Sequence, residues 1–60
     1  MIRVRTIART ALDINPAHVV AILYVEDDRA EVHLTDFVAH VSTVEADRVR
    51  RAVEVFLNGE

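Results

Sequence analysis

An apolar hairpin is followed directly by an amphipathic helix, and the two together occupy most of this 60-residue chain. The first hairpin strand is predicted over AHVVAILYV (17–25), a run rich in the β-branched residues that strands favour. Asp27 and Asp28 form the predicted two-residue turn, and the chain returns along AEVHLTDF (30–37). A chain this short has room for one small sheet and one helix packed against it.

The helix carries its own start and stop signals. Ser42 and Glu45 stand at the spacing of a capping box, in which the hydroxyl and the carboxylate satisfy free N–H groups of the first turn. Asn58-Gly59 is typical of a helix end. Between these signals, one apolar stripe recurs at helical spacing: Val49, Ala52, Val53, Phe56 and Leu57. We therefore expect one amphipathic helix within residues 42–59.

The remaining residues supply further strands. Residues 1–7 alternate apolar and charged side chains, which predicts a half-buried strand, and residues 11–14 resume extended structure after a turn at Arg9-Thr10. Pro16 interrupts the chain before the hairpin, and residues 37–41 predict a last short strand. The predicted fold class is α+β, in one domain over residues 1–60. It comprises a small curved antiparallel sheet of three to four strands and one C-terminal amphipathic helix.

The two-residue turn decides which hairpin residues share a face. Leu23 would lie opposite Val32 and Ala21 opposite Leu34, so this face is apolar throughout and predicts the core side. The other face is apolar on the first strand and mostly polar on the second. Its apolar members are Val20, Ile22, Tyr24 and Phe37. Such a half-apolar face predicts a partner or oligomer interface, although a register slip of one residue would exchange the two faces.

The predicted core draws on every element of the chain. Its members are Ile2, Val4, Leu12, Ile14, Val19, Ala21, Leu23, Val32, Leu34, Val49, Val53 and Phe56. Apolar residues make up 52% of the chain, more than one small core can hide, and there is no cysteine to staple the fold. Self-association is the remaining way to bury more surface, so we expect a homo-oligomer.

Charge and motif content exclude several classes of function. A formal net charge of −3 is unlike that of a non-specific nucleic-acid binder, which is basic. There is no nucleophile–base motif and no glycine-rich phosphate loop, so we expect neither an enzyme nor a cofactor. His18, His33 and His40 do not have metal-ligand spacing, and no metal site is expected. No apolar run is long enough for a signal peptide or a membrane span, which favours a cytoplasmic protein without membrane contact.

Arginines supply all seven basic residues of the chain, which is typical of proteins from GC-rich bacterial or phage genomes. Arg3 and Arg5 share one face of the first predicted strand, and Arg9 lies nearby. Arginines on short strands can grip the phosphates of RNA or of a nucleotide. They can equally keep an edge strand from pairing with other chains, and this is the interpretation we favour. The three remain candidate anion-binding residues.

The opening MIRVRTIARTALDINP (1–16) resembles that of the FlbD-type flagellar and swarming-motility proteins. The shared positions are Met1, Ile2, Val4, Ile14, Asn15 and Pro16, and the similarity continues through AHVVAI, AEVHLTD and VEADRV. It implies a shared strand–helix plan and a regulatory role without enzymatic activity, and it supplies no site residues. The family usually has glycine in two turns where this chain has Arg9 and Phe37. Because bulky residues avoid positive φ, we expect these turns to be built differently.

Together these observations predict a small non-enzymatic interaction or regulatory module that acts as a homo-oligomer. It would bind a protein partner through Val20, Ile22, Tyr24 and Phe37, and an Ile22→Glu variant should split the oligomer or abolish partner binding. The alternative is an oligomeric nucleotide- or RNA-binding protein, such as a phage-encoded inhibitor or nucleotide sponge. In that case Arg3, Arg5 and Arg9 would line the anionic ligand.

Overall fold

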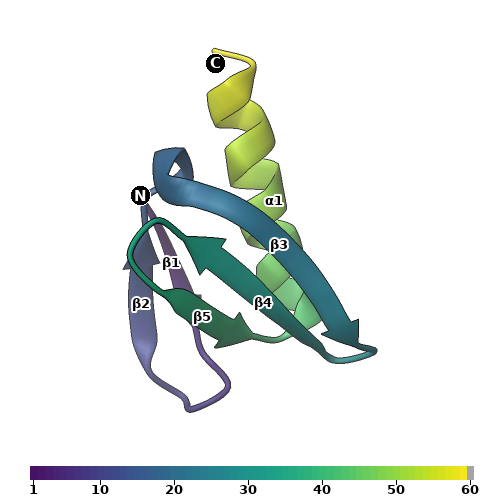
Figure 1. The fold of residues 1–60 in the computed structure, drawn as a ribbon. Coiled ribbons are helices and arrows are strands. Elements are labelled where there is room, and N and C mark those ends of the chain that lie inside the picture. Colours follow the sequence, from purple (N-terminus) through teal and green to yellow (C-terminus); the bar gives the residue numbers. More distant parts are fainter. Residues whose placement is uncertain (60) are drawn as a thin grey trace.

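A computed structural model describes residues 1–59 as five strands, one 3-10 helix and one α-helix (Figure 1). The elements are β1 (Ile2–Arg5), β2 (Ala11–Ile14), η1 (Pro16–His18), β3 (Val19–Glu26), β4 (Arg29–Leu34), β5 (Val38–Val41) and α1 (Thr43–Leu57). All strand pairs are antiparallel, in a sheet of β1 and β2 and a sheet ordered β3-β4-β5. The predicted α+β class is confirmed, with the strands divided between two small sheets.

The turn between β1 and β2 contains an arginine, Arg9, whose backbone is in the left-handed conformation. The N–H of Arg9 donates to the carbonyl of Thr6 at 2.9 Å, and the N–H of Thr6 donates to the carbonyl of Thr10 at 2.9 Å. This pattern is a tight turn followed by a bulge, which requires a positive φ at its last residue. Arg9 adopts a φ of 66° there. The expectation that a turn without glycine avoids positive φ is therefore wrong at Arg9.

The break at Pro16 is a short 3-10 helix. The Asn15 side chain caps this helix, because its Oδ1 accepts the N–H of Ala17 at 3.0 Å. Pro16 occupies the first position, where its missing N–H costs nothing. The strand predicted from Ala17 therefore begins at Val19 and ends at Glu26.

The main hairpin keeps its predicted turn but not its predicted register. Glu26 lies opposite Arg29, so Asp27 and Asp28 form the two-residue turn as expected. The register then shifts at Val25, which has no partner on β4. A β-bulge of this kind inserts one extra residue into one strand, and the side chains beyond it change face, here as far as a second bulge at Val20.

The bulge exchanges the two faces of β3. Ile22 lies opposite the fully buried Val32, while Leu23 lies opposite Glu31 on the outer face. Ala21 is exposed, and Leu23 is 48% exposed. The predictions that Ala21 and Leu23 face the core and that Ile22 faces away from it are therefore wrong.

The two sheets meet at the end of β5. Thr6 pairs with Val41, and the N–H of Ile7 donates to the carbonyl of His40 at 2.9 Å. The chain that follows β1 therefore lines part of the second edge of β5. The outer edge of β3 has no strand partner within residues 1–59.

Helix α1 begins at its predicted cap, but the cap is only half of a capping box. The Ser42 hydroxyl accepts the N–H of Glu45 at 3.3 Å. The Glu45 carboxylate instead accepts the N–H of Arg5 at 3.2 Å and pairs with Arg48. Glu45 thus ties the first helical turn to β1. Asn58 caps the other end of α1, and Gly59 follows with a φ of 75°.

The core consists of small and medium aliphatic side chains. Its buried members are Val4, Ile14, Ala30, Val32, Ala39, Val41, Ala46 and Val49. Partly buried residues pack around them: Ile2, Leu12, Val19, Ile22, Leu34 and Val53. Phe56, predicted in the core, is 53% exposed, because it lies in the last turn of α1, beyond the buried residues Ala46 and Val49. Most other predicted core residues are buried or partly buried, apart from the two that the bulge displaces.

Candidate interaction surface

The three aromatic side chains of the chain all lie outside its core. Tyr24 is 48% exposed, Phe37 45% and Phe56 53%. Aromatic side chains have the largest apolar area to bury and dominate the energetics of cores and interfaces. The strongest apolar groups of this chain are therefore left at its surface.

An apolar groove of about 360 Å³ runs between β3 and the C-terminal half of α1. We call its main apolar members the β3–α1 surface: Val20, Ile22, Tyr24, Val53, Phe56 and Leu57. Val20 is 68% and Leu57 73% exposed, so both leave most of their apolar side-chain surface open to solvent. Arg50 and Glu54 also line the groove, and their ion pair of 3.2 Å balances their charges. The groove therefore offers apolar contact without an unbalanced charge.

Tyr24 is anchored at the groove by a hydrogen bond to α1. Its hydroxyl donates to Asp47 Oδ1 at 2.6 Å, joining the C-terminal half of β3 to the helix. This hydrogen bond, with partial burial and the charge of the Asp47 carboxylate, raises the pKa of Tyr24, and the nearby Arg50 opposes the shift. The aromatic ring is thus held in one position beside the groove.

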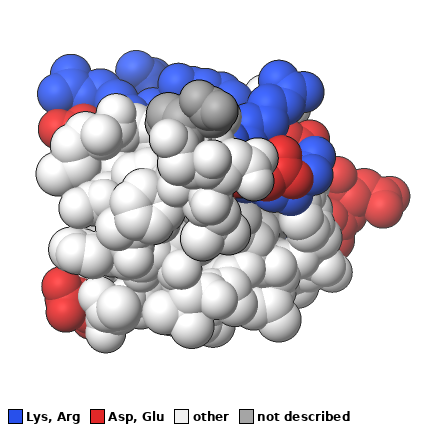
Figure 2. Space-filling view, turned by 90° about the horizontal axis from the view of Figure 1, so that it is seen from above, with Lys and Arg blue, Asp and Glu red and all other residues white. Residues whose placement is uncertain are grey.

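Charge is unevenly distributed around this end of the molecule. Figure 2 looks down on the end at which the helix finishes and shows a broad surface free of charged side chains. Arginines gather along one border of that surface, and acidic side chains lie around its margins. A wide uncharged area bordered by charge is typical of a protein interface.

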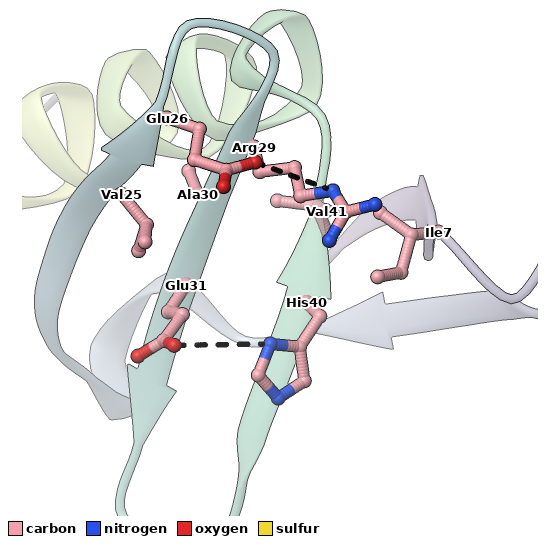
Figure 3. Close-up of a pocket in the computed structure, with 8 residues that line it drawn as sticks. All are labelled: Ile7, Val25, Glu26, Arg29, Ala30, Glu31, His40 and Val41. Atoms are coloured by element: carbon pink, nitrogen blue, oxygen red, sulfur yellow. Dashed lines mark ion pairs between the residues drawn. The ribbon is translucent and has the colours of Figure 1, made fainter.

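The outer face of the β3-β4-β5 sheet is more polar. Glu31 Oε1 lies 3.0 Å from His33 Nε2, and Glu31 Oε2 lies 4.0 Å from His40 Nδ1. Glu31 and His40 face each other across neighbouring strands in a shallow pocket of about 240 Å³, beside the Glu26–Arg29 ion pair (Figure 3). Within residues 1–59, no group of three or more histidines and carboxylates is arranged to hold a metal ion.

The predicted interface residues are not all brought together. Val20, Ile22 and Tyr24 line the groove beside α1, although Ile22 is half-buried against the core. Phe37 lies in the loop after β4 and lines a different hollow with Leu12.

Phe56 and Leu57 belong to this surface and were missed, because both fell on the apolar helix stripe that predicted core packing. The sequence feature that could have indicated their exposure is their position in the last helical turn before Asn58-Gly59, where a helix has the least sheet beneath it.

The candidate anion-binding arginines are spread along the first hairpin. Arg3 Nε lies 2.9 Å from Asp13 Oδ1 across the strand pair. The hydrogen bond and charge of Arg3 lower the pKa of Asp13, so this guanidinium is already balanced. Arg5 lies on the same strand, whereas Arg9 occupies the turn. Neither Arg5 nor Arg9 makes an ion pair with another residue in the range 1–59.

Comparisons of the chain with protein-family models, with curated proteins and with solved structures find no match. In the described part of the chain, α1 is too short and too polar to cross a membrane.

Proposed function

We propose that this chain is a non-enzymatic interaction module that assembles as a homo-oligomer, with the β3–α1 surface as its contact. One observation carries the proposal. Val20, Tyr24, Phe56 and Leu57 are each about half exposed or more around a single groove whose two charged residues neutralise each other. A contiguous exposed apolar surface rimmed by polar residues commonly marks an interaction site.

The energy available from association is large for so small a chain. A standard interface buries about 800 Å² on each partner, which is about a fifth of the 4209 Å² that this chain exposes. Complete burial of one valine, leucine or phenylalanine side chain is worth about 1.5–3 kcal/mol. A domain of this length has a stability of only about 3–9 kcal/mol. Burying the β3–α1 surface in a contact would therefore contribute a free energy comparable with the free energy of unfolding of the single chain.

A pair of matched substitutions tests this surface. Val20 on the groove is 68% exposed, and Val44, on the first turn of α1, is 69% exposed. Val20→Glu should weaken self-association by roughly tenfold or more, because a carboxylate would have to be buried in the contact. Val44→Glu adds the same charge at equal exposure and should leave association unchanged. Ile22→Glu is a poor probe, because Ile22 packs against the core and its loss would unfold the domain.

The measurement is sedimentation velocity over a range of protein concentrations, with circular dichroism to confirm that each variant is folded. If Val20→Glu associates as tightly as the unmodified chain, the β3–α1 surface is not the contact. If Val44→Glu is as disruptive as Val20→Glu, the effect is one of net charge and the surface is again not supported.

A second candidate function is the binding of an anionic ligand, a nucleotide or RNA. It is supported by Arg5 and Arg9 of the first hairpin, neither of which makes an ion pair within residues 1–59. Exchanging Arg5 and Arg9 together for alanine should then abolish binding of a labelled RNA at low salt. Arg3→Ala is the matched control, because Asp13 already balances Arg3. No binding by the unmodified chain at low salt would exclude this function.

The regulatory role in flagella or swarming that the FlbD-type resemblance implies is compatible with a non-enzymatic interaction module. It stays a prediction about the partner of the oligomer.

A further inference from the structure

The outer edge of β3 is a long strand edge without a partner in residues 1–59. β4 pairs with one side of β3, and β3 ends the order β3-β4-β5. An open edge presents backbone N–H and C=O groups that another strand can satisfy. β5 differs, because Thr6 and Ile7 bond to part of its second edge.

The side chains of β3 give this edge little protection against pairing. Natural edge strands are commonly blocked by lysine, proline or inward-pointing charges. Residues 19–25 of β3 carry no charge and no proline. The exposed positions of the β1–β2 hairpin, by contrast, carry Arg3, Arg5 and Asp13. The bulges of β3 at Val20 and Val25 are its only interruptions, and they leave a regular stretch over residues 21–24.

We infer that β3 pairs antiparallel with β3 of a second copy of this chain, about a twofold axis that passes through Ile22. This inference rests on the proposed self-association and assigns its geometry. A twofold contact requires a patch that is complementary to itself. Residues 19–25 satisfy that requirement, because an uncharged stretch in one copy packs against the same uncharged stretch in the other. A strongly charged partner would find no opposite charge on β3.

The charge at the end of β3 favours this register over an axis at Leu23. With the axis at Ile22, Ala21 faces Leu23 of the second copy and Val20 faces Tyr24. Residues paired in this way share a face, and Val20 and Tyr24 both line the groove. An axis at Leu23 would instead set the carboxylate of Glu26 against Val20, in an apolar contact, at a high desolvation cost. The axis at Ile22 brings Glu26, the last residue of β3, towards His18, the residue before β3, and both are exposed.

The same pairing completes the groove. An antiparallel pair of edge strands continues the sheet and leaves the two α1 helices on one side of it. The second copy then brings its own Val20 and Tyr24 to the open side of each groove, next to Phe56 and Leu57. β3 has eight residues and is about 26 Å long. The contact would be centred on the regular stretch over residues 21–24.

Engineered cysteines test the register directly, because the chain has no cysteine of its own. Ala21→Cys and Leu23→Cys chains are prepared separately, mixed, refolded together and oxidised. Residues directly opposite each other have Cβ atoms about 4.5–5.5 Å apart, within reach of a disulfide after a small shift. In a dimer of two copies of the same variant, the two cysteines would be two residues out of register. Their Cβ atoms would then be about 8 Å apart, too far for a disulfide.

The expected result is a disulfide-linked dimer in the mixture at several times the yield of either variant alone. Crosslinking of Leu23→Cys alone would move the axis to Leu23 and overturn the inference. An unmodified chain that self-associates while the mixture forms no crosslink would also overturn the inference, and the proposed oligomer would stand. An unmodified chain that stays a monomer at all concentrations would overturn both.

Discussion

At the scale of single residues, Tyr24 links the interaction surface to the helix through its bond to Asp47. It is the only tyrosine of the chain, so the absorbance of tyrosinate reports its titration alone. We predict a titration midpoint above the ordinary value of about 10. Asp47→Asn should lower the midpoint, because it removes the hydrogen bond and the charge that favour the protonated hydroxyl. Asp36→Asn, at an exposed position away from α1, is the control.

This shift also gives a pH dependence with a definite sign. The pKa of Tyr24 is raised in the folded state, so its contribution to stability is fully present below the pKa of an unfolded tyrosine. The contribution is lost as the pH rises through the higher pKa of the folded chain. The thermal unfolding midpoint, measured against pH, should therefore fall more in the unmodified chain than in Asp47→Asn as Tyr24 titrates. An equal fall in both would contradict the role given to the Tyr24–Asp47 hydrogen bond.

The left-handed conformation of Arg9 is a second feature at this scale. A side chain with φ near 66° costs about 1–2 kcal/mol, whereas glycine adopts that angle freely but loses more entropy on folding. Arg9→Gly should therefore stabilise the fold by about 0.5–1 kcal/mol in urea unfolding. Arg9→Ala removes the charge and keeps the strain, so it should give no such gain. Equal stabilisation by both variants would assign the effect to charge.

At the scale of elements, the junction between β5 and α1 depends on Ser42. Its hydroxyl caps the helix, and the first helical turn is tied to β1 because the Glu45 carboxylate accepts the N–H of Arg5. Ser42→Ala should cost about 1 kcal/mol of unfolding free energy, measured by urea titration. Ser42→Asp keeps an accepting oxygen and should recover most of that loss. A neutral Ser42→Ala variant would show that the packing of α1, not its cap, determines the helix start.

The elements themselves were largely predictable, and the register of the sheet was not. Alternation, proline and capping residues marked the strands, the helix and the Asp27-Asp28 turn. The bulges occur at Val20 and Val25, which are ordinary strand residues and carry no sequence signal for a bulge. Because the extra residue at Val25 turns over the side chains between the two bulges, the prediction exchanged Ile22 with Leu23. Arg9 similarly occupies a position where glycine would have been the signal.

The candidate surface was predictable only in part, for the same reason. Val20 and Tyr24 were expected at an interface and lie on the groove, but beside α1 and not on the outer sheet face. Phe37 could not be separated from them without knowing how the loop after β4 is arranged. Phe56 continues the stripe of Val49 and Val53, and periodicity alone cannot distinguish a buried turn from a projecting one.

At the scale of the whole molecule, association and folding should be coupled. The core contains no aromatic side chain among its buried members, and a single chain of this size buries only about 60% of its unfolded surface. A contact made only by folded chains stabilises them by mass action. The thermal midpoint of the unmodified chain should therefore rise with protein concentration. The midpoint of Val20→Glu should be lower and nearly independent of concentration in the same calorimetric series.

The central claim is that this chain associates with itself, and sedimentation equilibrium of the unmodified protein tests it most directly. The protomer has a mass of 6.8 kDa. We predict a species of twice that mass that dissociates reversibly on dilution and is lost in Val20→Glu. A single species at the protomer mass, up to the highest concentration that remains in solution, would contradict the account.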